Sequence, residues 1–384
     1  MNNQSSVDKI NAKRRRAQKL QHQGEYADAV QQQVELINEQ GGFSAERTED
    51  MHLLGLYLFQ LGDIPAACTV LKQVYGYIPE HVDVAKNLAI CELKLGHYDA
   101  ALEILERAAR AHPENFELRD VLAHTAGQRG DLRLSAQHGQ KSIELKHSAV
   151  TKNFTQTLAL TESPPRLNLA NPGENIIAFS LWGQQAKYLD GAIINAKLAP
   201  DIYPGWRCRF YLDQSVPRVV VDKLYALGAE IVEMPSASQA FDGLFWRFLV
   251  ADDERVSRFI VRDCDAVVNI KERAAVDVWC QSSCHFHVMR DFYTHSELIL
   301  AGMWGGVSGV LPNLARTIND YKASLQLRTR IIDQVFLRER IWPLIHQHTL
   351  VHDSQFELPD AQQFPQFARL AEGRHVGQDV TLFS

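Results

Sequence analysis

Arg258-Phe-Ile-Val-Arg-Asp-Cys-Asp265 is an apolar run that ends abruptly in two aspartates separated by one residue. Side chains alternate between the two faces of an extended strand, so Asp263 and Asp265 are expected on the same side. Two carboxylates in that arrangement suit a hard divalent cation such as Mg²⁺ or Mn²⁺, which fills its remaining positions with water and phosphate oxygens. A solvated turn after a strand is the alternative interpretation, because Asp-x-Asp on its own is a common pattern.

The composition is that of a globular protein. The chain has 384 residues, of which 46% are hydrophobic and 22% charged, and this length predicts two domains. A formal net charge of -6 argues against a general nucleic-acid binder. The basic cluster Lys13-Arg14-Arg15-Arg16 is interpreted as the wet face of a first helix, with peripheral contact to acidic lipid as the alternative. Because no apolar stretch of about 18 residues is present, we expect a cytoplasmic protein without a transmembrane segment.

The first half of the chain repeats itself at an interval of 34 residues, which separates Gly62, Gly96 and Gly130. The same interval relates four further sets: Leu54, Leu88 and Leu122; Gly55, Ala89 and Ala123; Ala67, Ala101 and Ser135; and Pro79 and Pro113. Glycine ends one helix, small residues let two helices approach closely, and proline stops the second helix. Each unit is therefore predicted to be a helix-turn-helix hairpin.

This pattern resembles the tetratricopeptide repeat, whose period is the same. Three full units are expected at about 46–79, 80–113 and 114–147, after an irregular unit in which Gly24-Glu-Tyr-Ala-Asp-Ala-Val30 opens the second helix. We therefore expect a helical repeat domain over residues 1–150. Stacked hairpins leave a concave surface, so capture of a peptide or protein partner, assembly into a homodimer and support of the second domain are the alternative uses.

The second half has a different pattern. The repeat fails after about residue 148, and proline-rich and glycine-rich turns predict a linker over 151–174. Strands are expected at 176–181, 208–212, 230–234 and directly before Asp263, and helices at 186–199, 217–227 and 241–251. Such alternation predicts an α/β domain over 175–384 with a mostly parallel sheet, in which ligands bind beyond the carboxyl ends of the strands.

Six segments of this second half resemble a bacterial group of GT-A fold glycosyltransferases. They are Phe179–Gly183, Tyr203–Tyr211, Phe245–Phe248, Arg262–Asp265, Phe286–Asp291 and Ile299–Gly306. The resemblance covers most of residues 175–356 and rests on the order and spacing of the segments. It implies a nucleotide-sugar donor, with a UDP-sugar favoured and a GDP-sugar possible, and Mn²⁺ or Mg²⁺ at the Asp-x-Asp element. The expected fold class is thus a tetratricopeptide helical solenoid followed by a GT-A, Rossmann-like α/β domain.

The resemblance also implies a set of residues around the donor. They are Phe179, Ser180, Leu181, Trp182, Gly183, Tyr188, Arg247, Arg262, Trp304, Gly305, Gly306 and Gln334. Arg247 is expected to reach the diphosphate or the sugar, and a surface ion pair with Asp252 or Asp253 is its alternative. Arg262 either contacts the donor or orients Asp263. The segment from Trp304 is expected to be a sugar-facing loop, with a tight bend behind a buried strand as the alternative.

Catalytic and further metal-binding roles are assigned to residues near the ends of other predicted elements. If the enzyme inverts the anomeric centre, a carboxylate must take the acceptor's proton, and Asp291 and Asp333 are the candidates. Asp333 lies on a predicted helix, where a charge on a solvated face is the alternative. His352 is the expected third metal ligand, with Asp353 as its substitute and His375 as a competing histidine.

The predicted function is the metal-dependent transfer of a sugar from a nucleotide diphosphate sugar to an acceptor. The acceptor is a protein or peptide held by the repeats, or a glycan or glycolipid precursor. A non-catalytic scaffold with a degenerate second domain is one alternative. A nucleotidyltransferase is another, because it also uses paired aspartates and a metal but releases pyrophosphate.

Overall fold

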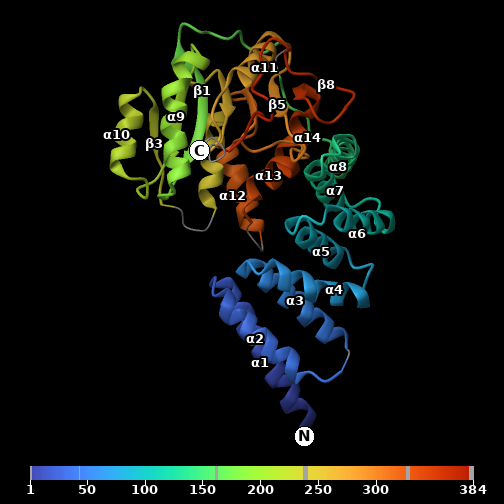
Figure 1. Cartoon of the computed structure of the whole chain (residues 1–384). Coiled ribbons are helices and arrows are strands. Elements are labelled where there is room, and N and C mark those ends of the chain that lie inside the picture. Colours follow the sequence, from blue (N-terminus) through green and yellow to red (C-terminus); the bar gives the residue numbers. More distant parts are fainter. Residues whose placement is uncertain (1, 43, 161–162, 237–240, 326–328, 380–384) are drawn as a thin grey trace. The chain divides into compact units, whose positions relative to one another are not determined.

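The computed structural model describes residues 2–42, 44–160, 163–236, 241–325 and 329–379 (Figure 1). The chain divides into two units, Met1–Ser142 and Ile143–Ser384. The first is helical and the second contains a mixed sheet with helices, so the expected order of a helical repeat region and an α/β domain is confirmed. Among the described residues, none of the helices combines the length and the apolar character that a membrane crossing needs.

The helices of the repeat region fall where the 34-residue interval predicts them. They are α1 (Asn2–His22), α2 (Tyr26–Glu39), α3 (Ala45–Leu61), α4 (Ile64–Tyr77), α5 (Val82–Lys94), α6 (Tyr98–Ala111), α7 (Phe116–Arg129) and α8 (Leu132–Thr151), the last of which contains the division between the units. Gly62 and Gly130 end α3 and α7 in the left-handed conformation, with φ of 93° and 91°. Only glycine adopts this conformation without steric cost, which explains the periodic glycines.

The small residues of the repeat serve close helix packing. A Cβ atom built on Gly55 of α3 would lie 2.7 Å from Cγ of Leu71 in α4, nearer than side chains ever approach. Ala89 and Ala123, which occupy the same position in the next two units, are fully buried. The interval therefore records where one helix of each hairpin lies against its neighbour.

One member of the basic cluster has a structural task that its sequence context did not indicate. Arg14 donates through Nε and Nη2 to the two carboxylate oxygens of Asp50, at 2.9 and 2.7 Å. Asp50 is fully buried and also accepts from Nε2 of Gln40 at 2.6 Å. Burial alone would raise the pKa of Asp50, but these hydrogen bonds lower it. The charged pair thus fastens α1 to α3.

The second unit contains an eight-stranded sheet in the order β3-β2-β1-β4-β6-β5-β7-β8. The strands are β1 (Asn175–Leu181), β2 (Arg207–Leu212), β3 (Glu230–Glu233), β4 (Arg258–Val261), β5 (Phe286–Arg290), β6 (Trp304–Val307), β7 (Thr349–Asp353) and β8 (Ala361–Gln362). Neighbours pair in parallel except at β6, which is antiparallel to both β4 and β5. The expected mostly parallel sheet is therefore interrupted by one reversed strand.

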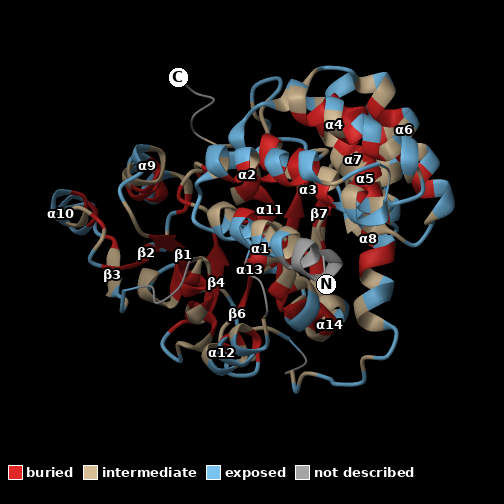
Figure 2. Ribbon diagram, turned by 90° about the horizontal axis from the view of Figure 1, so that it is seen from below, coloured by how far each residue is buried: buried red, intermediate tan, exposed pale blue. Residues whose placement is uncertain are grey.

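Helices cover both faces of this sheet. One layer holds α9 (Ala186–Ile202), α10 (Arg218–Ala226) and α11 (Ile270–Gln281), and the other holds the 3-10 helix η2 (Asp242–Asp252), α12 (Leu314–Ser324), α13 (Ile332–Phe336), a π-helical turn (Leu337–Ile341) and α14 (Trp342–Ile345). Alternate residues of β1 enter the two layers, with Ile177 and Phe179 in the first and Ile176 in the second. Figure 2 shows the central strands β1 and β4 buried between these layers.

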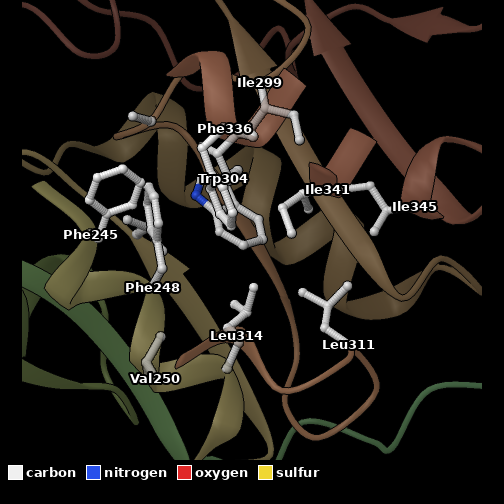
Figure 3. Close-up of a cluster of buried hydrophobic side chains, with 14 of the residues drawn as sticks. Phe245, Phe248, Val250, Ile299, Trp304, Leu311, Leu314, Phe336, Ile341 and Ile345 are labelled. Atoms are coloured by element: carbon white, nitrogen blue, oxygen red, sulfur yellow. The ribbon is translucent and has the colours of Figure 1, made fainter. Parts of the chain in front are cut away.

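The segment 241–251 departs from the expected α-helix. It forms η2, whose aromatic side chains Phe245 and Phe248 pack on Phe336 and Trp304 (Figure 3). Eight of its eleven residues are buried. A tight 3-10 geometry places side chains at positions i and i+3 on one side, which suits a segment packed almost entirely into the core.

We predict that Gly55→Ala destabilises the repeat region by roughly 1 to 3 kcal/mol, because the added methyl group overpacks the contact with Leu71. Gly76→Ala is the matched control, since Gly76 lies in the neighbouring helix α4 with open space around its Cα. That control should gain about 0.5 to 1 kcal/mol from its better helix propensity. Urea unfolding followed by far-ultraviolet circular dichroism measures both changes. Equal effects of the two substitutions would contradict the packing role of Gly55.

Candidate functional site

The two aspartates of the Asp-x-Asp element follow the carboxyl end of β4, as the sequence predicts. The side chain of Asp263 is 45% exposed and that of Asp265 is 19% exposed. Two glycines hold the segment closely: a Cβ on Gly191 of α9 would lie 2.0 Å from the carbonyl oxygen of Cys264, and a Cβ on Gly302 would lie 2.0 Å from Oδ2 of Asp263. Only glycine fits at these positions, so the placement of both carboxylates depends on backbone approach from two sides.

Arg247 is the centre of the site. It is 3% exposed and its guanidinium group contacts the carboxylate of Asp263, the Oδ2 atom of Asp333 at 3.0 Å and the carbonyl oxygen of Arg262 at 3.1 Å. Its backbone N–H donates to Oγ of Ser180 at 2.9 Å. One buried cation therefore joins β1, the end of β4 and α13.

The alternative interpretation of Arg247 as a surface residue is wrong. Asp252 instead accepts the backbone N–H groups of Leu314 and Ala315 at the start of α12, at 2.8 and 2.9 Å. Asp253 pairs with Arg209, at 2.9 Å. Asp252 and Asp253, the two expected partners of Arg247, thus bind other groups. Contact between Arg247 and a donor stays a prediction.

Asp333 is a buried carboxyl group whose pKa is raised toward neutral pH. It is 3% exposed, and burial, followed by the negative charge of Asp263, raises its pKa to about 6, although Arg247 opposes this rise. A carboxyl group that titrates near neutral pH can accept a proton during turnover and release it afterwards. The alternative of a charge on a solvated helix face is wrong, because the side chain is buried.

Asp265 is paired with a lysine that the sequence reasoning missed. Nζ of Lys187, in the first turn of α9, lies 2.9 Å from Oδ2 of Asp265 and 3.0 Å from Oδ2 of Asp379. It also lies 4.5 Å from the ring centroid of Tyr188, the residue expected beside the nucleoside base. Its position at the start of the helix that follows β1 was the available signal. Such a lysine is well placed to meet an anionic ligand at the carboxyl end of the sheet.

Asp263 and Asp265 stay the predicted ligands of a divalent cation. Burial and the neighbouring charge of Asp263 raise the pKa of Asp265, so the carboxylates repel one another and a cation between them would relieve that repulsion. Among the described residues no group of three or more His, Cys, Asp and Glu side chains is arranged to hold a metal ion. A Mg²⁺ or Mn²⁺ ion held by Asp263 and Asp265 would therefore complete its shell with water and ligand oxygens, which is usual for Mg²⁺.

The structure does not bring His352 to these aspartates. His352 is 1% exposed in β7, where its Nδ1 atom lies 2.8 Å from Nε2 of His287, and burial lowers its pKa to about 4. Asp353 accepts the backbone N–H groups of Gln355 and Phe356, both at 2.8 Å. The competing histidine, His375, stacks on Phe292 with ring centroids 4.0 Å apart. The expectation of a third ligand from this set is corrected accordingly.

Asp291 is less suited to proton transfer than Asp333. It is 3% exposed and its carboxylate accepts from Nζ of Lys271 at 2.5 Å, Oγ of Ser354 at 2.6 Å and the backbone N–H of Val376 at 2.8 Å. These donors occupy both carboxylate oxygens, so the group fastens three segments of chain together. Of the two carboxylates proposed as bases, the structure therefore favours Asp333.

The end of β1 contributes fewer ligand-facing groups than expected. Phe179 and Leu181 are fully buried, and Phe179 stacks on Phe210 with ring centroids 4.8 Å apart, so neither side chain is available to a nucleoside. Trp182 is half-buried and packs edge-on against Trp246. Gly183 has a positive φ of 74°, and its N–H donates to Oγ of Ser215 at 2.7 Å. Of the residues 179–183, only Ser180, Trp182 and Gly183 remain candidates for contact with a ligand.

Trp304, Gly305 and Gly306 form strand β6 and not a sugar-facing loop. Trp304 is fully buried against Phe259, and a Cβ on Gly305 would lie 2.5 Å from the carbonyl oxygen of Phe259. The glycines are needed because neighbouring strands pack closely here.

The remaining two predicted residues, Arg262 and Gln334, form hydrogen bonds with other residues of the second unit. Nε of Arg262 donates to Oε1 of Glu272 at 3.2 Å, and only the Arg262 carbonyl group reaches the site, through Arg247. Arg262 therefore does not orient the carboxylate of Asp263 with its own side chain. Gln334 is half-buried and its backbone N–H donates to Oδ1 of Asp333 at 3.0 Å.

Residues 58–124 match a tetratricopeptide repeat family, which establishes these repeats in the first unit. No curated protein matches the chain. A solved structure of MamA from Desulfovibrio magneticus RS-1 is 24% identical over 36% of this chain and 76% of its own, with a TM-score of 0.33. YrrB, a tetratricopeptide repeat protein with an unusual peptide-binding site, is 14% identical over 37% of this chain and 70% of its own, with a TM-score of 0.33. An O-GlcNAc transferase mutant from Thermobaculum terrenum is 15% identical over 67% of this chain and 46% of its own, with a TM-score of 0.41.

We predict that ionisation of Asp333 makes the stability of the protein fall as the pH rises from about 4 to about 6. The folded chain holds this proton up to pH about 6, whereas the unfolded chain releases it near 3.8. At about 1.4 kcal/mol per unit of pKa, the expected loss relative to Asp333→Asn is roughly 2 kcal/mol between pH 4 and pH 7. Urea unfolding of both proteins across this range measures the difference. Parallel pH profiles would contradict the raised pKa.

Proposed function

We propose that the second unit is a metal-dependent glycosyltransferase that uses a nucleotide diphosphate sugar, with a UDP-sugar as the favoured donor. The observation that carries the proposal is the linked set of Asp263, Arg247 and Asp333 at the carboxyl end of the sheet, with Asp265 and Lys187 beside it. Paired carboxylates, two cations and a carboxyl group that titrates near neutral pH are the groups that such a transfer needs.

Each of these residues has a task in the proposed transfer. Asp263 and Asp265 would hold Mn²⁺ or Mg²⁺, which supplies positive charge to a departing diphosphate. Lys187 lies beside Asp265 and would donate to the phosphate oxygens, while Arg247 keeps Asp263 and Asp333 in a fixed relation. Asp333 would take the proton of the acceptor hydroxyl group, since its raised pKa gives it sufficient basicity near neutral pH.

The repeat region would serve to capture a protein or peptide acceptor. A cavity of 580 Å³ lies between α3 and the start of α5, and its walls include Glu49, His52, His81 and Asp83. Burial lowers the pKa of His52, so this imidazole is neutral near pH 7. Two carboxylates beside the neutral imidazole of His52 favour a peptide with hydroxyl or basic side chains. A glycan or glycolipid precursor is the alternative acceptor.

A non-catalytic scaffold is the second candidate, and it is favoured by the match of residues 58–124 to a repeat family. The two candidates differ in whether the second unit binds a nucleoside diphosphate together with a metal. If it does, UDP with Mn²⁺ should stabilise the protein by about 2.7 kcal/mol at a hundred times the dissociation constant. A nucleotidyltransferase is the third alternative. Its product distinguishes it from a glycosyltransferase, because it releases pyrophosphate and not a nucleoside diphosphate.

We predict that Asp265→Asn lowers metal-dependent donor hydrolysis and transfer by a factor of about 100 to 1000, the usual loss when one electrostatic stabiliser is removed. Product analysis of a panel of nucleotide sugars with Mn²⁺ measures the activity. Asp222→Asn is the matched control, because Asp222 pairs only with exposed Arg218 on α10 among the described residues and should keep full activity.

An excess of chelator should abolish the activity of the unchanged protein, and added Mn²⁺ should restore it. Full activity in the presence of the chelator would contradict the metal assignment. Absence of both hydrolysis and UDP-dependent stabilisation across the panel would favour the scaffold.

A further inference from the structure

One cavity in the described part of the second unit lies away from the Asp-x-Asp element. It has a volume of 620 Å³, and its walls include Pro165, Leu167, Arg258, Arg273, Asp277 and Cys280. Arg258 is the first residue of β4, whereas Asp263 follows the last residue of the same strand. Five residues of extended chain span roughly 16 Å, so this cavity is separate from the site described above.

Arg258 is a buried cation without a carboxylate partner among the described residues. It is 1% exposed, and its Nη2 atom donates to the carbonyl oxygen of Pro165 at 2.9 Å. Its Nε and Nη1 atoms have no hydrogen-bond partner in the described part of the chain. The guanidinium group stacks over the ring of Trp279 at 4.8 Å, which offsets only part of the cost of burial. Burial lowers the pKa of Arg258.

Arg273 is a second cation in the wall of the same cavity. Its Nε atom donates to Oδ1 of Asp277 at 2.7 Å, and its Nη1 atom is buried without a partner among the described residues. Arg166 also lies in the wall, so the cavity is lined by three guanidinium groups and one carboxylate. Buried charges in proteins are normally paired, and an unmade hydrogen bond to such a group costs about 1 to 3 kcal/mol or more.

We propose that this cavity binds a phosphorylated small molecule whose phosphate group pairs with Arg258 and Arg273. Guanidinium groups form charge-assisted hydrogen bonds with phosphate oxygens, and the Nε and Nη1 atoms of Arg258 both lack a partner in the described part of the chain. Low exposure to water strengthens such a pair. A volume of 620 Å³ exceeds what a phosphate ion needs and falls within the range of small-molecule sites, so a sugar phosphate fits better than the free ion.

Isothermal titration of inorganic phosphate and of glucose 1-phosphate into the full chain tests the proposal directly. The buffer contains a chelator, and its ionic strength is held constant. Without a metal ion the proposed donor site does not contribute to the titration, so the result does not depend on whether the proposed glycosyltransferase function is correct. One saturable site is expected, with tighter binding of glucose 1-phosphate. Arg258→Met and Arg273→Gln should each weaken binding about tenfold or more. Arg255→Gln is the matched control, because Arg255 is exposed and lies outside the cavity walls.

The rate of cysteine alkylation shows whether the ligand binds in this cavity. Cys280 is part of the cavity wall, whereas Cys284 is similarly half-buried and is not. Either phosphate compound should slow the alkylation of Cys280, measured by peptide mass spectrometry, and leave that of Cys284 unchanged. This measurement uses the unaltered protein and stays decisive if an arginine variant fails to fold.

Three results would overturn the proposal: no saturable binding of either compound, equal affinity in Arg258→Met and in the unaltered protein, or equal protection of the two cysteines. If inorganic phosphate binds as tightly as glucose 1-phosphate, the site recognises the free anion and the sugar-phosphate assignment is lost.

Discussion

The second unit is organised around one buried guanidinium group. Arg247 pairs with Asp263 and Asp333 together, and the buried carboxylate of Asp333 would be costly to place in its position without it. Because its own backbone is held by Ser180 at the end of β1, the cation ties the first strand, the Asp-x-Asp segment and α13 into one arrangement. The geometry of the site therefore depends on the packing of η2 into the core.

The same constraint explains the division of tasks among the acidic residues. Asp263 is partly exposed and shares its charge with Arg247, Asp265 faces Lys187, and Asp333 is buried deeply enough for its pKa to reach about 6. These three carboxylates thus differ in burial and in partner, and burial raises the pKa of Asp265 and of Asp333. Asp291, equally buried, is surrounded by three donors and serves to join segments.

The sheet also separates two regions of different electrostatics along a single strand. Beyond the last residue of β4 lie the carboxylates with their cations, and at its first residue lies Arg258, buried and unmatched by a carboxylate among the described residues. A cation left in that state is unusual in a well-packed interior. Its presence beside a large cavity is the physical basis for expecting an anionic ligand there.

Much of the architecture followed from local patterns in the sequence. The 34-residue interval located the repeat helices, because left-handed glycines and close helix contacts recur once per hairpin, and short apolar runs located β1, β2 and β4. Tertiary structure alone decided which polar groups meet. Arg247 and Asp333 are 86 residues apart, His352 pairs with His287 and not with the aspartates, and the glycines after Trp304 pack a buried strand. Such partnerships depend on strand order and on layers that meet across the sheet, and no spacing along a chain records them.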